Sequence, residues 1–296
     1  MQILIADEME KEVVEEIRKL GSVEYKPSPV DLPKKLENAD VLIVRSATKV
    51  TKELLTHAKK LKIVARAGVG LDNVDAKACE EKSIKVMNTP GASTNAVAEL
   101  ALGLMICGLR NVQKAHHQMK NGIWDKKNLI GREIEGKTIG IIGYGRIGAM
   151  LGKKAFALGM NVIAYNPPPR HDDGIVKYVE LYELLSQSDV ISIHAALTDS
   201  TRNVINRENI AKMKDGVMII NSARGEIVNE DALYEACKSG KVSCAALDVF
   251  SVEPYKGKLT ELDNIYLTPH LGASSKEAQA RIGSELVKIL QNELKK

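Results

Sequence analysis

The sequence predicts an α/β fold made of two doubly wound domains, each with a parallel sheet that helices cover on both faces. Short apolar runs alternate with amphipathic stretches from the N-terminus until Thr89-Pro90-Gly91, and the alternation begins again at Lys137. The length of 296 residues also suits two domains, because domains usually contain ~100–200 residues. Hydrophobic residues make up 44% of the sequence and aromatic residues 4%, so we expect aliphatic cores.

The first series of elements is expected to form one parallel sheet, because strands and helices alternate along it. The expected strands are Ile3–Ala6, Ser22–Tyr25, Val41–Val44, Ile63–Arg66 and Lys85–Met87, and the expected helices are Glu10–Leu20, Pro33–Leu36, Lys52–His57 and Asp75–Glu81.

A single long helix, Thr94–Lys120, is expected to connect the two domains, and Asn121-Gly122 suits its end. The second series should form a sheet of six strands. These strands are Lys137–Ile142, Asn161–Tyr165, Val190–His194, Val217–Asn221, Ala245–Val249 and Ile265–Leu267, and the clearest helices are Arg146–Leu158 and Glu230–Ser239. The last helix, Ser275–Leu294, is expected to return to the first domain. That domain would then be discontinuous, with residues 1–92 and 273–296 on either side of a second domain, 93–272.

Composition argues against several classes of partner. The net charge is +4, from 42 basic and 38 acidic residues, and no block concentrates it, so no nucleic-acid partner is expected. The segment Met1–Asp7 is too short and too soon acidic for a signal peptide, and no apolar run reaches the ~18 residues of a membrane span. We therefore expect a cytoplasmic protein without a membrane partner. The four cysteines are expected to be free thiols, and no metal site is expected.

A glycine-rich motif opens the second domain. Gly143-Tyr144-Gly145-Arg146-Ile147-Gly148 directly follows the apolar strand and begins a helix, which is the context of a dinucleotide-binding turn. Gly143 would make the tight turn, Gly145 would admit the pyrophosphate, and Gly148 would let helix and strand pack closely. The N–H groups of the helix start, Arg146 and Ile147 included, would face the phosphates. The motif predicts a Rossmann cofactor domain; the alternative is a glycine-rich turn without a ligand.

The residue expected to contact the adenosine ribose is Asn166, at the end of the second strand of this domain. An acidic residue is usual there, but an amide can also donate to and accept from hydroxyls. It lacks the charge that repels a 2′-phosphate, and Arg170 follows closely. We expect NAD as the cofactor, and NADP stays open.

Three further segments carry a family resemblance. Asn221–Val228, Asp248–Pro254 and Thr268–Ala273 resemble, in this order, the signature segments of the D-2-hydroxyacid dehydrogenases. The resemblance covers essentially the whole sequence. It implies that a Rossmann cofactor domain is inserted in a flavodoxin-like substrate domain, and that Arg224, Glu253 and His270 form the catalytic centre.

These residue types suit the reaction that the resemblance implies. Oxidation of a secondary alcohol needs a base for the hydroxyl proton, and histidine, with an ordinary pKa of ~6.5, serves near neutrality. Glu253 would orient the imidazole and stabilise its charged form. Arg224 presents a planar fork that matches an α-carboxylate. Taken singly, an arginine after a strand is more often part of a surface ion pair, a Glu-Pro pair is more often a turn, and a histidine often caps a helix. The prediction therefore depends on the three together.

The resemblance assigns further residues to the cofactor and substrate sites. Those for the cofactor are His194, Ala195, Thr198, Ala223, Asp248, Thr94 and Gly272, with Asp248 at the nicotinamide carboxamide. Val44–Val50 and Ala65–Asp75 resemble segments of the 3-phosphoglycerate dehydrogenases, a branch of this family. They imply a phosphorylated hydroxy acid as substrate, with Arg45 as a candidate for its phosphate and Lys49 and Arg66 as weaker ones. The substrate-site residues are Arg45, Ser46, Gly68, Val69, Gly70 and Lys126.

The specific hypothesis is therefore NAD-dependent oxidation of 3-phosphoglycerate to 3-phosphohydroxypyruvate, the entry to serine biosynthesis. A homodimer is expected by resemblance, with residues 94–132 contributing and Lys126 reaching the partner's phosphate site. Longer relatives append a serine-binding regulatory domain, for which this sequence has no room, so no serine inhibition by that route is expected. The alternatives are a hydroxypyruvate or glyoxylate reductase of the same family, and a nucleotide-sensing corepressor or scaffold on the same fold.

Overall fold

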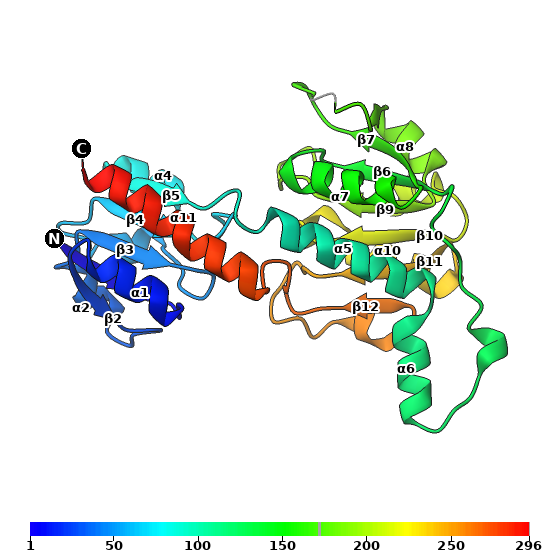
Figure 1. Cartoon of the computed structure of the whole chain (residues 1–296), viewed down its shortest axis with the longest axis horizontal. Helices are drawn as coiled ribbons and strands as arrows, with labels where there is room; N and C mark the ends of the chain where they lie inside the picture. Colours follow the sequence, from blue (N-terminus) through cyan, green and yellow to red (C-terminus); the bar gives the residue numbers. More distant parts are fainter. Residues whose placement is uncertain (171–172, 296) are drawn as a thin grey trace. The chain divides into compact units, whose positions relative to one another are not determined.

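The computed structural model describes residues 1–170 and 173–295. The protein divides into two compact units, one made of Met1–Thr94 with Ala273–Lys296 and the other of Asn95–Gly272 (Figure 1). The α/β fold class that the sequence predicted is confirmed, because each unit is built on one parallel sheet with helices on both faces.

The first unit has a sheet of five parallel strands in the order β2-β1-β3-β4-β5. This is the flavodoxin-like order of a doubly wound sheet. The strands are β1 (Gln2–Ile5), β2 (Ser22–Tyr25), β3 (Val41–Val44), β4 (Ile63–Arg66) and β5 (Lys85–Asn88). The helices are α1 (Lys11–Arg18), α2 (Leu32–Leu36), α3 (Lys52–Leu55), α4 (Ala76–Glu81) and α11 (Lys276–Leu294).

Two apolar layers cover the faces of this sheet. On one face α1 and α11 pack side by side, and α11 contributes the buried residues Ile282, Leu286 and Leu290 to the core. The two helices lie close together, because a Cβ added at Gly283 of α11 would come within 2.1 Å of Cγ2 of Val13 in α1. The other face is covered by α2, α3 and α4. The return of the last helix to the first unit thus completes its core.

The second unit has a sheet of seven parallel strands in the order β12-β11-β10-β9-β6-β7-β8. Counted from β6, this is the order 3-2-1-4-5-6 of a dinucleotide-binding sheet with one further strand. The strands are β6 (Thr138–Ile142), β7 (Asn161–Tyr165), β8 (Lys177–Tyr178), β9 (Val190–Ile193), β10 (Val217–Asn221), β11 (Val242–Leu247) and β12 (Ile265–Leu267). The expectation of six strands was wrong, since the sheet has seven. The strand that was missed is β8, which has two residues, too few to show an alternation of apolar and polar positions.

Helices cover both faces of this second sheet, α5 and α7 on one face and α8, α9 and α10 on the other. Their bounds are α5 (Thr94–Leu109), α6 (Val112–Lys120), α7 (Arg146–Ala157), α8 (Leu181–Gln187), α9 (Arg207–Ala211) and α10 (Glu230–Ser239), and short 3₁₀ turns are η1 (Lys126–Asn128), η2 (Gly225–Ile227) and η3 (Lys258–Glu261).

The single connector helix expected over Thr94–Lys120 was also wrong. The helix breaks at Asn111, which has a φ of 54°, so that α5 and α6 meet at a bend of 65°. Asparagine enters this left-handed conformation more readily than most residues. Half of α5 is buried against the sheet, whereas none of α6 is buried, and α6 projects away from the sheet in Figure 1.

Of the helices in the described part of the protein, none is by itself both long and apolar enough to cross a membrane, although α5 and α6 together meet that measure as a bent pair. Cys79, Cys237 and Cys244 are buried free thiols, and Cys107 is a half-buried one. Burial raises the pKa of the Cys237 and Cys244 thiols to about 12, so both are protonated at neutral pH. Among residues 1–170 and 173–295, no group of three or more His, Cys, Asp or Glu side chains is placed to hold a metal ion.

Candidate active site

The glycine-rich turn between β6 and α7 leaves room for a ligand at one position and for no side chain at two others. Gly143 has a φ of +92°, and a Cβ there would lie 2.5 Å from the main-chain nitrogen of Ala195. A Cβ at Gly148 would lie 2.3 Å from the carbonyl oxygen of Gly143. A Cβ at Gly145, by contrast, would meet no heavy atom within 4 Å. The space at Gly145 lies at the N-terminus of α7, which begins at Arg146, and such a cradle fits a pyrophosphate.

Asn166 follows β7 and is held by this turn. Its Oδ1 accepts a hydrogen bond from the main-chain nitrogen of Tyr144 at 3.0 Å, and its Nδ2 donates to the carbonyl of Pro167 at 2.8 Å. Arg170 donates from Nε to the carbonyl of Asn166 at 3.0 Å. The Arg170 guanidinium also lies 5.4 Å from the ring centroid of Tyr178 and 3.6 Å from Glu180. The amide thus braces the turn, and its contact with a ribose stays a prediction.

His194, at the end of β9, lies beside the same turn. Its Nε2 is 2.8 Å from the hydroxyl of Ser192, and its Nδ1 is 3.4 Å from the hydroxyl of Ser222. Burial disfavours the charged imidazole and lowers the pKa of His194 to about 4. The ring is therefore neutral at physiological pH. Thr198, farther along the loop, accepts and donates within a turn that it forms with Thr201.

The ionisable pair at the far end of the sheet is His270 with Glu253. Nδ1 of His270 lies 2.9 Å from Oε2 of Glu253, and Oε1 of Glu253 accepts from the main-chain nitrogen of Phe250 at 3.1 Å. His270 has a φ of 55°, a conformation in which histidine is several-fold enriched. Its side chain is 52% exposed, so the imidazole edge opposite Glu253 is accessible.

Asp248, at the end of β11, holds the segment that carries His270. Its side chain is buried, with the residue 1% exposed. Oδ1 accepts from the Thr268 hydroxyl at 2.6 Å and from the Leu271 nitrogen at 2.7 Å, and Oδ2 accepts from the Gly272 nitrogen at 2.8 Å. The contact of Asp248 with the nicotinamide carboxamide, expected from the sequence, stays a prediction. The bracing of the histidine loop was not foreseen, although an Asp directly after a buried strand was a signal for it.

Arg224 follows the neighbouring strand β10. Asn221 braces this segment, because its Nδ2 donates to the carbonyl of Arg224 at 2.8 Å and its Oδ1 accepts from the nitrogen of Ala223 at 3.0 Å. Arg224 itself donates from Nη1 to the carbonyl of Ala223 at 2.6 Å. The next residue, Gly225, lies against the main chain of Phe250, where a Cβ would come within 1.9 Å of the carbonyl carbon. The segments with Arg224 and Glu253 are thus in direct contact.

The three catalytic candidates therefore gather at one edge of the second unit, since each follows one of three adjacent strands: β10, β11 and β12. The carboxyl edge of an open parallel sheet is where such folds bind ligands. The arrangement combines a guanidinium that suits a carboxylate with an imidazole whose orientation a carboxylate fixes. Such a pair can take or give one proton at Nε2.

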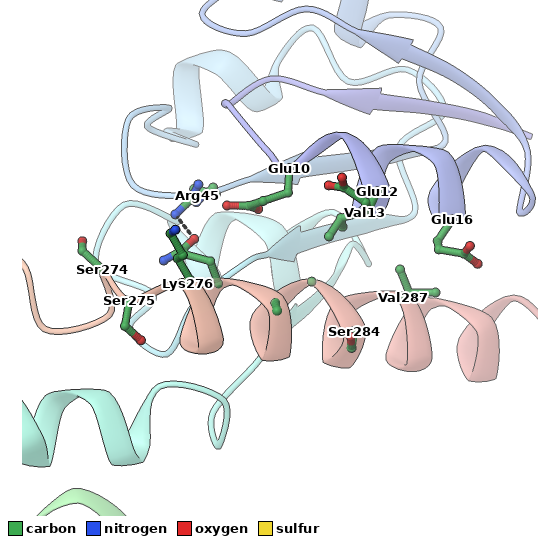
Figure 2. A pocket seen from close by; sticks show the side chains of 13 residues that line it. Glu10, Glu12, Val13, Glu16, Arg45, Ser274, Ser275, Lys276, Ser284 and Val287 are labelled. Atoms are coloured by element: carbon green, nitrogen blue, oxygen red, sulfur yellow. Dashed lines mark hydrogen bonds between the residues drawn. The ribbon is translucent and has the colours of Figure 1, made fainter.

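Most of the candidate substrate residues lie at the corresponding edge of the first unit. Arg45 follows β3, and its guanidinium donates to the carbonyl of Glu8 at 3.1 Å and to Oε1 of Gln279. Arg45 and Gln279 line a cavity of about 860 Å³ between α1 and α11 (Figure 2). Ser46 is exposed on the loop that follows. Nothing in the sequence singled out Gln279, which lies far from Arg45 along it.

The turn after β4 is the second part of this edge. Gly68 has a φ of +153°, and a Cβ there would come within 2.2 Å of Nη1 of Arg66, so the guanidinium of Arg66 lies over Gly68. Asn88 holds the turn by donating to the carbonyl of Val69 at 2.6 Å, and Gly70 ends it. Because β3 and β4 are hydrogen-bonded neighbours with Val44 opposite Arg66, this turn and Arg45 share one edge of the sheet.

Three candidates remain. Lys126 is exposed in η1, and Thr94 is the first residue of α5. Gly272, at the end of the second unit, donates to Asp248, and a Cβ there would make a tight contact of 3.2 Å with Oδ2 of Asp248.

The fold and this site define a class of protein, the oxidoreductases that use a nicotinamide dinucleotide. The protein belongs to the D-isomer specific 2-hydroxyacid dehydrogenases, whose NAD binding domain model matches residues 102–272. The second unit is therefore an NAD-binding domain, and the residues of its turn fit that cofactor.

The names of similar proteins refer to more than one substrate. Hydroxypyruvate reductase of Thermotoga maritima is 54% identical over 268 residues, which cover 89% of this sequence and 88% of that protein. D-3-phosphoglycerate dehydrogenase of Methanocaldococcus jannaschii is 44% identical over 305 residues, which cover 99% of this sequence and 58% of that protein. Thus this protein spans little more than half the length of that relative.

Among solved structures, D-lactate dehydrogenase from Aquifex aeolicus, complexed with NAD and lactic acid, matches with a TM-score of 0.88 and 30% identity. The match covers 100% of this protein and 96% of that one. The likeness therefore extends to both units.

Proposed function

We propose that this protein oxidises 3-phosphoglycerate to 3-phosphohydroxypyruvate with NAD, and that Arg45 binds the phosphate of the substrate. The observation that carries the choice of substrate is Arg45, a guanidinium braced at the carboxyl edge of the first sheet. A guanidinium is suited to a phosphate, with which it forms bidentate hydrogen bonds. The Arg66 guanidinium over Gly68 adds a second positive group to the same edge.

The residues of the second unit have complementary roles in this reaction. Bound NAD would supply the acceptor for the hydride that leaves the carbon bearing the hydroxyl group. His270 takes the hydroxyl proton at Nε2, since its Nδ1 is directed to Glu253. Glu253 holds the ring and stabilises the imidazolium that forms. Arg224 binds the α-carboxylate and polarises the neighbouring carbonyl as it develops.

The glycine-rich turn and its neighbours hold the cofactor. Gly143, Gly145 and Gly148 shape the cradle at the start of α7, where the N–H groups of Arg146 and Ile147 would hold the pyrophosphate. Asn166, His194, Ala195 and Thr198 would hold the adenosine, and Ala223, Asp248, Gly272 and Thr94 would hold the nicotinamide.

Reduction of hydroxypyruvate is the second candidate, and the identity of 54% with the Thermotoga maritima enzyme of that name favours it. That reaction uses the same acid and base in the reverse direction. It needs no phosphate site, so the side chain of Arg45 distinguishes the two candidates.

The test compares initial rates with 3-phosphoglycerate and with D-glycerate, each with NAD and with NADP, for the wild type and the Arg45→Ala variant. If the proposal holds, the wild type prefers 3-phosphoglycerate with NAD, and Arg45→Ala raises KM for 3-phosphoglycerate by about 10-fold or more, as expected for a lost charged contact of ~1.4 kcal/mol or more. The matched control is Arg18→Ala, because Arg18 is an exposed arginine of the same unit that pairs with Glu15. Equal effects of Arg45→Ala on both substrates would reject the phosphate role.

We further propose a homodimer that uses the surface around α6 and η1. Large apolar side chains are exposed there, led by Ile130 at 85% and Trp124 at 79%, and a concentration of exposed apolar side chains in one segment suits an interaction surface. Lys126 lies between them in sequence and would reach the partner's phosphate site. Analytical ultracentrifugation tests the proposal: a dimer is expected for the wild type and a monomer for Trp124→Glu with Ile130→Glu, whereas a monomeric wild type would reject it.

A further inference from the structure

The loop that begins with Arg45 is held by two side chains from other parts of the first unit. In Arg45 and Thr48, both the backbone N–H group and the backbone carbonyl are bonded to side chains rather than to the backbone of a neighbouring strand. The residues between them, Ser46 and Ala47, are exposed. The loop conformation is thus set by the side chains that bond its two ends.

Asp7 holds the donor side of the loop. It follows β1, is buried with 3% exposure, and accepts from the nitrogen of Arg45 at 2.6 Å. It also accepts from the nitrogen of Thr48 at 3.1 Å and from the Thr48 hydroxyl at 2.5 Å. A buried carboxylate costs free energy unless it is hydrogen-bonded, and here the three donors all come from the loop.

Asn73 holds the acceptor side. Its Nδ2 donates one hydrogen to the carbonyl of Arg45 at 2.7 Å and the other to the carbonyl of Thr48 at 2.6 Å. Both hydrogens of the amide are therefore in use. Asn73 is itself fixed, because its own carbonyl accepts from the nitrogen of Val50 at 2.7 Å. Asp7 and Asn73 together form a clamp on the loop, and we use the name clamp for this pair.

We propose that the clamp residues Asp7 and Asn73 are positioning residues that set the selectivity for a phosphorylated substrate by fixing the direction in which the Arg45 side chain leaves the loop. This inference rests on the proposed function of Arg45. Both clamp residues bond Arg45 through its backbone. They act on the backbone, whereas Glu8 and Gln279 bind the guanidinium, and Figure 2 shows the resulting direction of Arg45, toward the start of α11.

The physical basis is preorganisation. A long side chain that must be ordered at the moment of binding loses ~0.5–1.5 kcal/mol of affinity, and a loop with a free backbone adds the ordering of that backbone. With the clamp intact, this cost is met on folding. Without the clamp, Arg45 keeps its charge but is no longer held in one position. Affinity for the phosphate therefore falls, while the chemistry at His270 is unaffected.

The experiment measures kcat and KM for 3-phosphoglycerate and for D-glycerate in Asn73→Leu, Arg45→Ala and the double variant. Leucine keeps the branched shape of Asn73 and removes both donors. We expect Asn73→Leu to raise KM for 3-phosphoglycerate about 10-fold, which corresponds to ~1.4 kcal/mol, with kcat and the KM for D-glycerate changed less than about twofold. Asn73→Gln, which restores the two donors, is expected to recover part of the loss.

The double variant separates positioning from a general structural role. If Asn73 acts through Arg45, then Arg45→Ala with Asn73→Leu is no weaker than Arg45→Ala alone, because the two residues act as a unit. Additive losses, or an equal rise in KM for both substrates after Asn73→Leu, would overturn the inference. A normal KM in Asn73→Leu together with a raised KM in Arg45→Ala would overturn the inference and leave the proposed function standing. Equal effects of Arg45→Ala on the two substrates would instead reject the proposed function.

Asp7 is tested through its partner, since Asp7→Asn leaves a buried N–H group without an acceptor and costs stability. Thr48→Val removes one of its three donors and keeps the backbone bonds. It is expected to raise KM for 3-phosphoglycerate by a smaller factor, about two- to fivefold at ~0.5–1 kcal/mol, at unchanged kcat. Thr56→Val is the matched control, because the Thr56 hydroxyl donates to a helix carbonyl away from the loop. A Thr48→Val enzyme with the same KM as this control would contradict the role of Asp7.

Discussion

Glu253 receives two hydrogen bonds that fix its position, one from His270 at 2.9 Å through Oε2 and one from the nitrogen of Phe250 at 3.1 Å through Oε1. The first bond places the proton of the neutral imidazole on Nδ1. The second prevents the carboxylate from turning away from the ring. Nε2 of His270 is therefore the atom that faces the substrate, and it is an acceptor before the proton is transferred.

Glu253→Gln is expected to lower kcat by about 100-fold or more, within the range of 10²–10⁴ for general acid–base catalysis. The amide oxygen can still orient the ring, but the negative charge that stabilises the imidazolium is lost. Steady-state kinetics at saturating substrate measure the effect, and His270→Gln is the reference. Because the pair acts as a unit, the double variant should be no slower than His270→Gln. A Glu253→Gln enzyme with wild-type kcat would exclude this role.

Asp248→Asn is expected to lower both stability and kcat. An amide accepts through one oxygen, so at least one of the N–H groups that Asp248 now satisfies would be left buried without a partner, at ~1–3 kcal/mol. Because those N–H groups belong to Leu271 and Gly272, the loop that carries His270 would be the part that loosens. Chemical denaturation measures the stability, and Thr268→Val, which removes one hydroxyl donor, should have the smaller effect. Unchanged stability in Asp248→Asn would contradict this account.

Gly145→Ala is expected to lower affinity for NAD alone, whereas Gly148→Ala is expected to lower stability as well. At Gly145 the added methyl group meets no protein atom within 4 Å, so the melting temperature should stay close to that of the wild type while affinity for NAD falls. At Gly148 the methyl group would lie 2.3 Å from the carbonyl of Gly143, so the turn must shift and stability falls as well. Calorimetric NAD titration and thermal unfolding measure the two effects. Normal NAD binding by Gly145→Ala would show that the pyrophosphate lies elsewhere.

His194 should make stability depend on pH below neutrality. The folded protein lowers the pKa of His194 to about 4, whereas the unfolded protein has an ordinary value of ~6.5. Because the unfolded state then binds more protons, the contribution is complete above pH ~6.5 and is lost as the pH falls toward 4, at up to ~1.4 kcal/mol for each pKa unit of difference. Urea unfolding of wild type and His194→Asn between pH 4 and 7.5 measures it. Parallel pH profiles for the two proteins would contradict the assignment.

Asn166→Asp should sharpen the preference for NAD over NADP. A carboxylate can accept from the Tyr144 nitrogen as the amide does, so the turn should keep its shape, and the added charge repels a 2′-phosphate. The ratio of dissociation constants for NADP and NAD is expected to rise about 10-fold or more, a change of ~1.4 kcal/mol. Fluorescence titration with both reduced cofactors measures it. An unchanged ratio would place the 2′ position away from residue 166.

The sequence predicted the helices and strands in which apolar positions recur with a regular period. It also predicted which residues follow the ends of strands. Strands such as β3 and β10 are fully buried, and every residue in them except Asn221 is apolar. Arg45 and Arg224 follow these strands, so the sequence places both at sheet edges without any knowledge of distances. The break at Asn111 was not predictable in the same way. The apolar pattern continues up to it, and one asparagine in a left-handed conformation ends the helix because of its local backbone.

The supporting contacts were largely beyond the sequence. Gln279 meets Arg45 across a separation of 234 residues, and Asp7 meets Thr48 across 41. Such pairs depend on which strands are neighbours and on which way a helix returns, and neither is encoded in local spacing. The sequence could name Asp248 and Asn166 as candidate residues of the site, but not the protein atoms that they bind.

The discontinuity of the first unit has a consequence for how the protein acquires its structure. The second unit is a single continuous segment, so it can complete its core as soon as residue 272 has left the ribosome, whereas the first unit lacks α11 until residues 276–294 are made. Until then the apolar side of α1 and the strands beneath it are open to water. The first unit, which carries Arg45, thus reaches its native structure after the second unit. Loss of α11 by truncation would leave the second unit folded and the first unit with an incomplete core.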